Sequence, residues 1–263
     1  MKPSLQFMVS FAPFRSIRRL FASAIISGIA LSAASVHAIT IDFTADEGYA
    51  SGQLTNHADW DTSWRYSVNP TSGIVSWTNG SNGAAVYGQA QQIGGAESVI
   101  SSSMVFRIQS LGGGTVASSV YMATLGFSVG GTQADAQAAN DNVKLIFARL
   151  AGEANYKLYF TTQQDPWTAT NVSLSSVGDT SVTGEWTDWL TLTLTLTKGE
   201  NASDWSLGAT IYNNSTSSIV ASLSFGGKKT SEAFYNSDLL YANFQTGNGT
   251  TGLEIDEFSV SAT

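Results

Sequence analysis

Glycoside hydrolysis needs a pair of carboxyl groups, and two acidic residues near the C-terminal end look at first sight like such a pair. Glu254 and Asp256 are alternate residues, so in a β-strand they project from the same face. Carboxyl groups about 5 Å apart suit a retaining mechanism, and a wider pair suits an inverting one. Glu257 is expected on the opposite face, and the next residue on the face of Glu254 and Asp256 is the uncharged Phe258. The spacing alone therefore does not predict a hydrolase.

Other catalytic signatures are missing from the sequence. There is no cysteine, which excludes a thiol nucleophile, a thiolate zinc site and a disulfide scaffold. The chain has no Gly-x-Ser-x-Gly elbow, no phosphate loop and no His-x-x-x-His pair. His57 is the only histidine after residue 38. A metalloenzyme built on one histidine is not expected.

Polar and aromatic side chains that alternate with apolar rows are the better candidates for a binding site. The predicted glycan-binding residues are Trp189, Arg107, Tyr159, Lys157 and Gln109. Each lies opposite the apolar row of its own strand, so together they could line a groove. A tryptophan ring offers an apolar face to sugar C–H groups and an N–H that donates a hydrogen bond. The alternative is that these residues form a solvated outer face.

The tryptophans divide by their expected position. By the alternation of side chains along a strand, Trp205 and Trp186 are expected to face the core and Trp189 to face the other side of its sheet. Trp64, Trp77 and Trp167 are expected in or near loops.

The elements that must position these residues are strands. Residues 190–197 read Leu-Thr four times, so the leucines share a buried face and the threonines a wetter one. Similar rows are predicted in residues 104–109, 205–211 and 219–225, and Tyr121 is expected to share a face with Ala123, Leu125, Phe127 and Val129. Residues 143–150 and 156–161 are typical of a hairpin, whereas 132–140 predict a long loop with room for one helical turn. Sheets with one apolar side must face each other, so we expect an all-β, two-sheet antiparallel β-sandwich.

The first 38 residues are predicted to be a signal peptide. Three arginines precede an uncharged stretch from Leu20 to Val36, and Val36-His37-Ala38 fits the small-x-small cleavage rule. An uncleaved membrane anchor is the alternative, since the stretch is near the length of a span. We expect residues 39–263 to form a single exported domain, secreted, extracellular or at the cell surface, with the periplasm as another location.

The net charge of the chain limits the kinds of binding partner that we expect. The full chain has 12 basic and 20 acidic residues, a net charge of −8, and residues 1–38 hold four of the basic residues and no acidic one. The acidic remainder disfavours nucleic acid and anionic membrane surfaces as partners. No membrane contact is expected after signal cleavage.

Three segments share their pattern with a known family. They are residues 41–49 (IDFTADEGY) followed by Gly52, Leu54 and Trp60; residues 186–190 (WTDWL) followed by Trp205 and 211–213; and residues 253–260 (LEIDEFSV). In these segments, which bracket nearly all of the chain after residue 38, the sequence resembles exported bacterial proteins with a concanavalin A-like (LamG-like) jelly-roll domain. The resemblance implies a two-sheet sandwich whose closing strand pairs beside the first and whose concave face often binds glycans.

The resemblance also implies a possible structural calcium near the chain ends, as in some members. Asp42, Glu47 and Asp256 would supply the oxygen ligands. The alternative is that they are surface acids at strand ends, since the chain has no compact Asp-x-Asp-x-Asp loop.

Two groups of enzymes with this fold, hydrolases and lyases, have residue patterns that can be compared with this sequence. The hydrolases carry Glu-x-Asp-x-Glu on one strand, and residues 254–258 depart from it at Phe258 and lie on the closing strand instead. The lyases use a His/Tyr pair with Arg and Gln or Asn, but His57 lies in an early loop without a Gln-x-His pattern. The leading hypothesis is therefore an exported, non-catalytic sandwich that binds polysaccharide or glycan or contributes to the cell surface or matrix. A polysaccharide-active enzyme of the same fold and a purely structural surface protein are the alternatives.

Overall fold

The Leu/Thr alternation forms β13 (Leu190–Thr197), as the sequence predicts. Its four leucines are buried, and its threonines are half-buried on the other face. Burying each leucine contributes about 1.5–3 kcal/mol to folding. The structure is a computed structural model, and it describes residues 37–77, 82–138, 140–162, 164 and 169–263.

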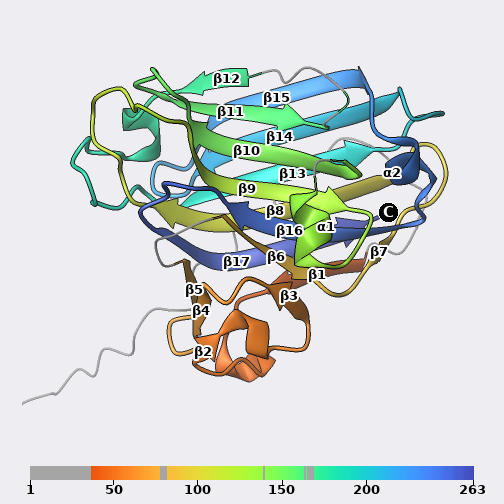
Figure 1. Ribbon diagram of the computed structural model, residues 1–263, viewed down its shortest axis with the longest axis horizontal. Helices are drawn as coiled ribbons and strands as arrows, with labels where there is room; N and C mark the ends of the chain where they lie inside the picture. Colours follow the sequence, from red (N-terminus) through yellow and green to blue (C-terminus); the bar gives the residue numbers. More distant parts are fainter. Residues whose placement is uncertain (1–36, 78–81, 139, 163, 165–168) are drawn as a thin grey trace, which may run out of the picture. The chain divides into compact units, whose positions relative to one another are not determined.

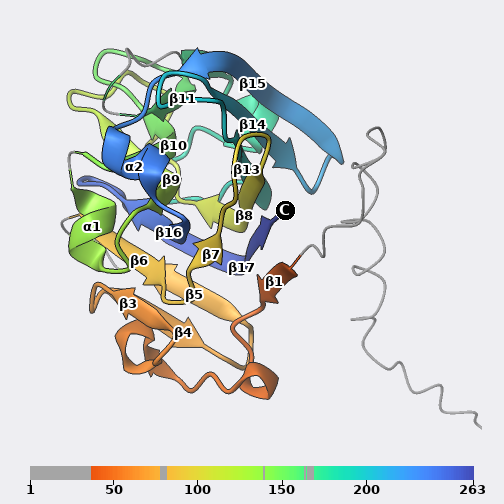
Figure 2. The ribbon, with the colours of Figure 1, turned by 90° about the vertical axis from the view of Figure 1, so that its right-hand side faces the viewer.

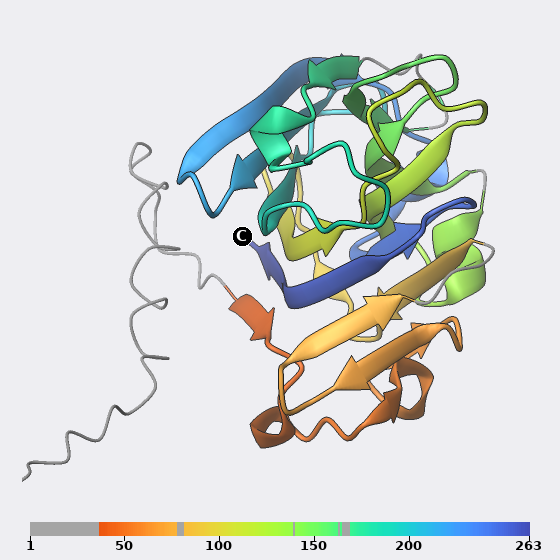
Figure 3. The same cartoon turned by 90° about the vertical axis from the view of Figure 1, so that its left-hand side faces the viewer.

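Two antiparallel sheets make up the fold, as predicted (Figure 1). The nine-stranded back sheet has the order β15-β14-β13-β8-β17-β5-β4-β2, with β1 also paired to β17. The eight-stranded front sheet, nearer the viewer in Figure 1, has the order β12-β11-β10-β9-β16-β6-β3, with β7 also paired to β16. Side views from either end show the two layers (Figures 2 and 3).

The strands of the back sheet are β1 (His37–Ile41), β2 (Gly52–Gln53), β4 (Tyr66–Asn69), β5 (Ile74–Trp77), β8 (Val99–Ile108), β13, β14 (Trp205–Asn213), β15 (Ser218–Lys228) and β17 (Leu253–Ala262). Those of the front sheet are β3 (Trp60–Thr62), β6 (Gly83–Tyr87), β7 (Gln91–Gln92), β9 (Val120–Ser128), β10 (Asn142–Arg149), β11 (Tyr156–Thr161), β12 (Ala169–Val172) and β16 (Leu239–Thr246). Short 3-10 turns are η2 (Ala45–Glu47), η3 (Leu54–Asn56) and η4 (Ser175–Val177).

The first and last strands pair, as the resemblance implies. One edge of β17 pairs with β8, and the other pairs first with β5 and then with β1. The register with β1 runs from His37 opposite Ala262 to Ile41 opposite Phe258. The two ends of the described chain therefore close the same sheet.

A β-bulge in β17 corrects one sequence expectation. The register against β8 shifts between Ile255 and Glu257, so Asp256 is the extra residue. Ile255 and Phe258 are both buried despite their odd spacing. Glu257 therefore does not point to the opposite face from Glu254, because the bulge leaves both residues outside the core.

Aromatic side chains join the sheets at one end of the core. The Trp60 ring on β3 lies 5.2 Å from that of Phe244 on β16 and 5.4 Å from that of Phe258 on β17. Tyr66 on β4 meets Phe244 edge-to-face at 5.2 Å. Such tilted and edge-to-face pairs add to the stabilisation that burial alone provides.

The loop predicted over residues 132–140 contains one short helix, α1 (Gln133–Gln137). The Thr132 hydroxyl accepts from the backbone N–H of Asp135, and the Asp135 carboxylate accepts from that of Thr132, which is a capping box. α1 lies on the outer face of the front sheet, where Ala136 packs against Ala84 and Val86 (Figure 1). A second short helix, α2 (Glu232–Asn236), was not predicted.

Most of the predicted signal peptide, residues 1–36, lies outside the described residues. β1 begins at His37, so cleavage after Ala38 would remove its first two residues and leave the pairs from Ile39 to Ile41. The described residues from His37 to Thr263 lie in one compact unit. Within the described residues, no helix has the length and apolar character needed to span a membrane.

Candidate functional site

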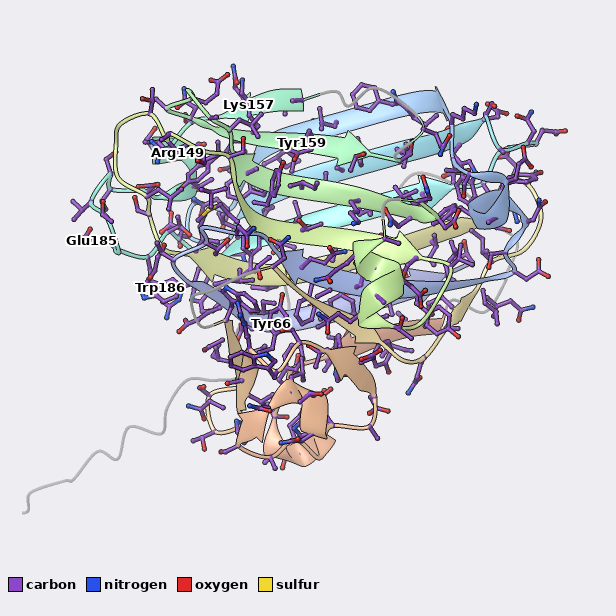
Figure 4. The ribbon with its side chains drawn as sticks, viewed as in Figure 1. Tyr66, Arg149, Lys157, Tyr159, Glu185 and Trp186 are labelled. Carbon is purple, nitrogen blue, oxygen red and sulfur yellow. The ribbon has the colours of Figure 1, made fainter. Side chains whose placement is uncertain are left out.

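The front sheet carries a groove on its outer face. Its volume is about 670 Å³, within the range of small-molecule sites. It is lined by Asn82, Tyr121, Thr124, Gln137, Lys144, Ile146, Tyr159, Thr161, Gln245, Thr246 and Gly247. Tyr159 is seen on β11 in Figure 4.

Strand register assembles the floor of the groove from two cross-strand rows. One row reads Thr161, Lys144, Gly126 and Asn243 across β11, β10, β9 and β16, and the next reads Tyr159, Ile146, Thr124 and Gln245. Their neighbours Leu145 and Phe147 point the other way and are fully buried in the core. The floor is therefore a direct product of period-2 alternation in four paired strands.

A second β-bulge brings Tyr121 to the groove. The register of β9 against β10 skips Met122, so Ala123 pairs with Phe147 and Tyr121 with Ala148. Met122 and Ala123 are both buried, whereas Tyr121 is 41% exposed. The sequence expectation that Tyr121 shares the apolar row of Ala123 is wrong, because the bulge turns its ring outward.

Lys144 is a nearly buried cation in the floor. It is 9% exposed, and burial lowers its pKa to about 8. A Cβ on Gly126 would lie 3.5 Å from the Lys144 Cγ and only 2.9 Å from the carbonyl oxygen of Val143. The bare backbone at Gly126 therefore leaves room for the lysine stem to lie across the sheet.

The two tyrosines of the groove differ in exposure. Tyr159 is 5% exposed, and this burial raises its pKa. The charge of Tyr121 and a hydrogen bond with that residue raise the pKa further. The Tyr159 phenol is therefore neutral at physiological pH. The exposed ring of Tyr121 offers an apolar face at the rim.

Gln245 adds an oriented amide. Its Nε2 donates to the carbonyl of Ala136 at 3.0 Å and to Oδ1 of Asn243 at 2.8 Å. With both N–H groups engaged, its Oε1 is the atom of this amide that can accept a hydrogen bond from a ligand.

The five predicted glycan-binding residues lie on different sheets. Lys157 and Tyr159 share the outer face of β11 (Figure 4), but only Tyr159 lines the groove. The Lys157 ammonium pairs with Glu153 at 3.3 Å and donates to Oδ1 of Asn171. Arg107 lies in β8 of the back sheet and Gln109 directly follows that strand, so the five do not converge on one groove.

Arg107 forms a compact cluster on the outer face of the back sheet. Its Nε and Nη2 lie 2.7 and 2.6 Å from Oε2 of Glu254. Its guanidinium lies 4.9 Å from the ring centroid of Trp186 and 4.7 Å from that of Trp189. Gln109 packs beside this cluster against Gly252. Trp189 therefore already stacks with a cation from its own chain.

The tryptophan expectations are partly confirmed. Trp205 is fully buried and Trp64 is 62% exposed, as expected. Trp77 belongs to β5 and is buried rather than in a loop. Trp186 is half-buried on Arg107 instead of in the core. Trp167 lies outside the described residues.

The residues predicted for calcium lie near one another without forming a ligand set. The Glu47 carboxylate accepts from the backbone N–H of Asp42 at 2.8 Å and so closes the turn before η2. Burial raises the pKa of Glu257, and the charges of Asp42, Asp256 and Glu47 raise it further. In the described part of the chain, no group of three or more His, Cys, Asp or Glu side chains is placed to hold a metal ion. The carboxylates as arranged do not fit a calcium site.

His57 has a packing role in the structure. It ends η3, and its ring lies 4.6 Å from that of Tyr49, whose hydroxyl accepts from Nε1 of Trp60. Glu254 is engaged with Arg107 on the other sheet. These residues are not brought together with the groove.

The sequence analysis missed Lys144, Thr124 and Gln245. Lys144 had a signal, because only it and Arg149 interrupt the apolar run from Val143 to Leu150 with a charge. A single lysine at an outward-facing position of a strand is common, however, so the sequence does not show that Lys144 belongs to a groove.

The fold, but not the sequence, has known relatives. The sequence matches no protein-family model and no curated protein. Among solved structures the chain is similar to arcelin-5, a lectin-like defence protein from Phaseolus vulgaris (14% identity, TM-score 0.54, 88% of this chain and 99% of that one). It is also similar to lectin II from Ulex europaeus (12%, 0.55, 86% and 98%) and to the lectin from Bauhinia forficata in complex with GalNAc (10%, 0.52, 87% and 99%). At such identities the likeness shows the concanavalin A-like jelly-roll fold of legume lectins.

Proposed function

We propose that the protein binds carbohydrate in the groove of the front sheet. The observation that carries the proposal is the make-up of the groove. The exposed ring of Tyr121 stands beside the amides of Gln245 and Gln137 and the hydroxyl of Thr124. A flat apolar face next to fixed hydrogen-bonding groups matches a pyranose ring, which has a C–H face and an equatorial rim of hydroxyls.

The fold supports this proposal only by analogy. Structures with the same jelly roll include a lectin complexed with galactose and another complexed with GalNAc, and these ligands are properties of those proteins. Function on a shared fold depends on the site, so the groove residues rather than the similarity must be tested.

A binding assay with two matched variants tests the proposal. Tyr121→Ala removes the exposed ring, and Tyr212→Ala makes the same change on β14 of the back sheet. Affinity electrophoresis through neutral and acidic polysaccharides should show retention of the wild type that Tyr121→Ala weakens about tenfold and Tyr212→Ala leaves unchanged. Lack of retention on every polymer, or equal loss in both variants, would contradict carbohydrate binding in this groove.

We further propose that the protein is exported, as the bacterial proteins that it resembles are, and works outside the cell or at its surface. The charge and small-residue pattern of residues 1–38 supports this. Intact-mass analysis of protein recovered from the medium or cell surface should give a chain that begins at Ile39. A full-length chain retained in the cytoplasm would contradict export.

A further inference from the structure

Among the residues that the structure describes, none of the residues lining the groove gives its floor cation, Lys144, an acidic partner. Lys144 makes no hydrogen bond or ion pair with the residues that the structure describes, and no described lining residue is Asp or Glu. This is unusual in a chain with 20 acidic and 12 basic residues. Buried charges are normally paired, because desolvation without a partner is costly.

Two other lysines of the chain have a partner that compensates for the loss of water around the ammonium group. Lys157, on the same face of the front sheet, pairs with Glu153. Lys198, also nearly buried, lies 5.1 Å from the ring centroid of Tyr235. Lys144 instead faces a groove large enough for a sugar, lined by neutral hydroxyls and amides.

We propose that the groove selects an acidic saccharide, a glycan with carboxylate or sulfate groups, whose anion pairs with Lys144. This inference rests on the proposed carbohydrate binding and adds the class of sugar. The ligand anion supplies the missing partner in a poorly hydrated site, where a charge-assisted hydrogen bond is stronger than at an exposed surface. The neighbouring Tyr159 and Gln245 then contact the uncharged part of the sugar.

The protonation of Lys144 gives the site a pH dependence. Burial lowers its pKa to about 8, and a bound anion raises it again because opposite charge favours the ammonium. Affinity for an acidic sugar should therefore fall as pH rises above about 8. In the part of the chain that the structure describes, the other titratable groups facing the groove are Tyr121 of β9 and Tyr159 of β11, with Lys157 one row away. β16 and α1 contribute the neutral Gln245 and Gln137.

Isothermal titration calorimetry with paired probes tests the inference. The probes are tetragalacturonate and its methyl ester, and a sulfated carrageenan tetrasaccharide and its desulfated form. Wild-type protein at pH 7 should bind one acidic probe at least tenfold more tightly than its neutral counterpart. The two pairs show whether carboxylate or sulfate is recognised.

Two variants assign the preference to Lys144. Lys144→Met keeps an unbranched side chain in the floor and should weaken the acidic probe about ten- to a hundredfold while leaving the neutral probe within twofold. Lys228→Met, a half-buried lysine of β15 in the back sheet, should change neither. Melting curves check that both variants fold.

The outcomes separate this inference from the proposed function. Equal affinity for acidic and neutral probes, or an acidic preference that survives in Lys144→Met, would overturn the role of Lys144 and leave carbohydrate binding intact. Failure of every saccharide, including the polymers tested with Tyr121→Ala, would overturn both.

Discussion

The buried ammonium of Lys144 should lower the stability of the folded protein. In the unfolded chain a lysine has its ordinary pKa of 10.5, and in the folded protein burial lowers it to about 8. This difference corresponds to about 3 kcal/mol of destabilisation at pH 7, where both states carry the charge. Lys144→Met removes the charge and should raise the unfolding free energy by up to that amount.

The destabilisation by Lys144 should depend on pH. Between pH 8 and 10.5 the folded protein loses the proton of Lys144 while the unfolded chain keeps it, so the unfolded state binds more protons. Stability of the wild type should therefore rise with pH through this window, by at most about 1.4 kcal/mol per pH unit. The advantage of Lys144→Met should be largest at pH 7 and nearly gone at pH 10.5.

Urea denaturation followed by tryptophan fluorescence measures this effect. Wild type, Lys144→Met and the control Lys228→Met are compared at pH 7, 8, 9 and 10. Effects of other groups on pH stability are common to the three proteins and cancel in the differences. An advantage that is absent at pH 7, or that stays constant up to pH 10, would refute a buried ammonium at this position.

Three other predictions concern the rest of the fold. Glu257→Gln should stabilise the protein at pH 7, because the raised pKa of Glu257 means that its charged form is less favourable in the folded protein than in the unfolded chain. This advantage should be lost near pH 4, where the folded wild type has bound a proton at Glu257. Chemical denaturation at the two pH values checks this. Leu194→Ala should cost about 2–5 kcal/mol in the same assay, since it opens a cavity at a fully buried position, and a cost below 1 kcal/mol would contradict the packing of β13. Arg107→Met should cost only about 1–2 kcal/mol, because the ion pair with Glu254 is partly exposed, and should shift the emission of Trp186 and Trp189 as their stacked cation is removed.

The period-2 alternation of apolar and polar residues was a sound basis for predicting the strands of the fold. β13 and the β10–β11 hairpin follow the predicted residues, because each buries one face and the pattern is local. The exceptions next to β-bulges are Tyr121, Glu257 and Ile219, and Ile219 is 56% exposed although residues 219–225 were predicted as an apolar row. A bulge shifts side-chain parity by one residue and is set by the partner strand, so the sequence of one strand does not reveal it.

The site was harder to predict than the fold. Arg107 and Tyr159 have the same polar parity, yet they lie on different sheets, because strand order depends on pairings between distant parts of the chain. β9 lies between β10 and β16, which are about a hundred residues apart in sequence, and their meeting creates the groove. Local patterns show which side chains leave the core but not which of them become neighbours.

The pairing of β1 with β17 has a consequence for how the chain acquires its structure. The back sheet can be completed only after the last strand has been synthesised, because residues at positions 37–41 hydrogen-bond with those at 258–262. Closing so long a loop is entropically slow, and folds dominated by such distant pairings form on the slow end of the kinetic range. β1 therefore has no partner in the back sheet until the residues of β17 are available, so the closing of this sheet should be a late step in folding.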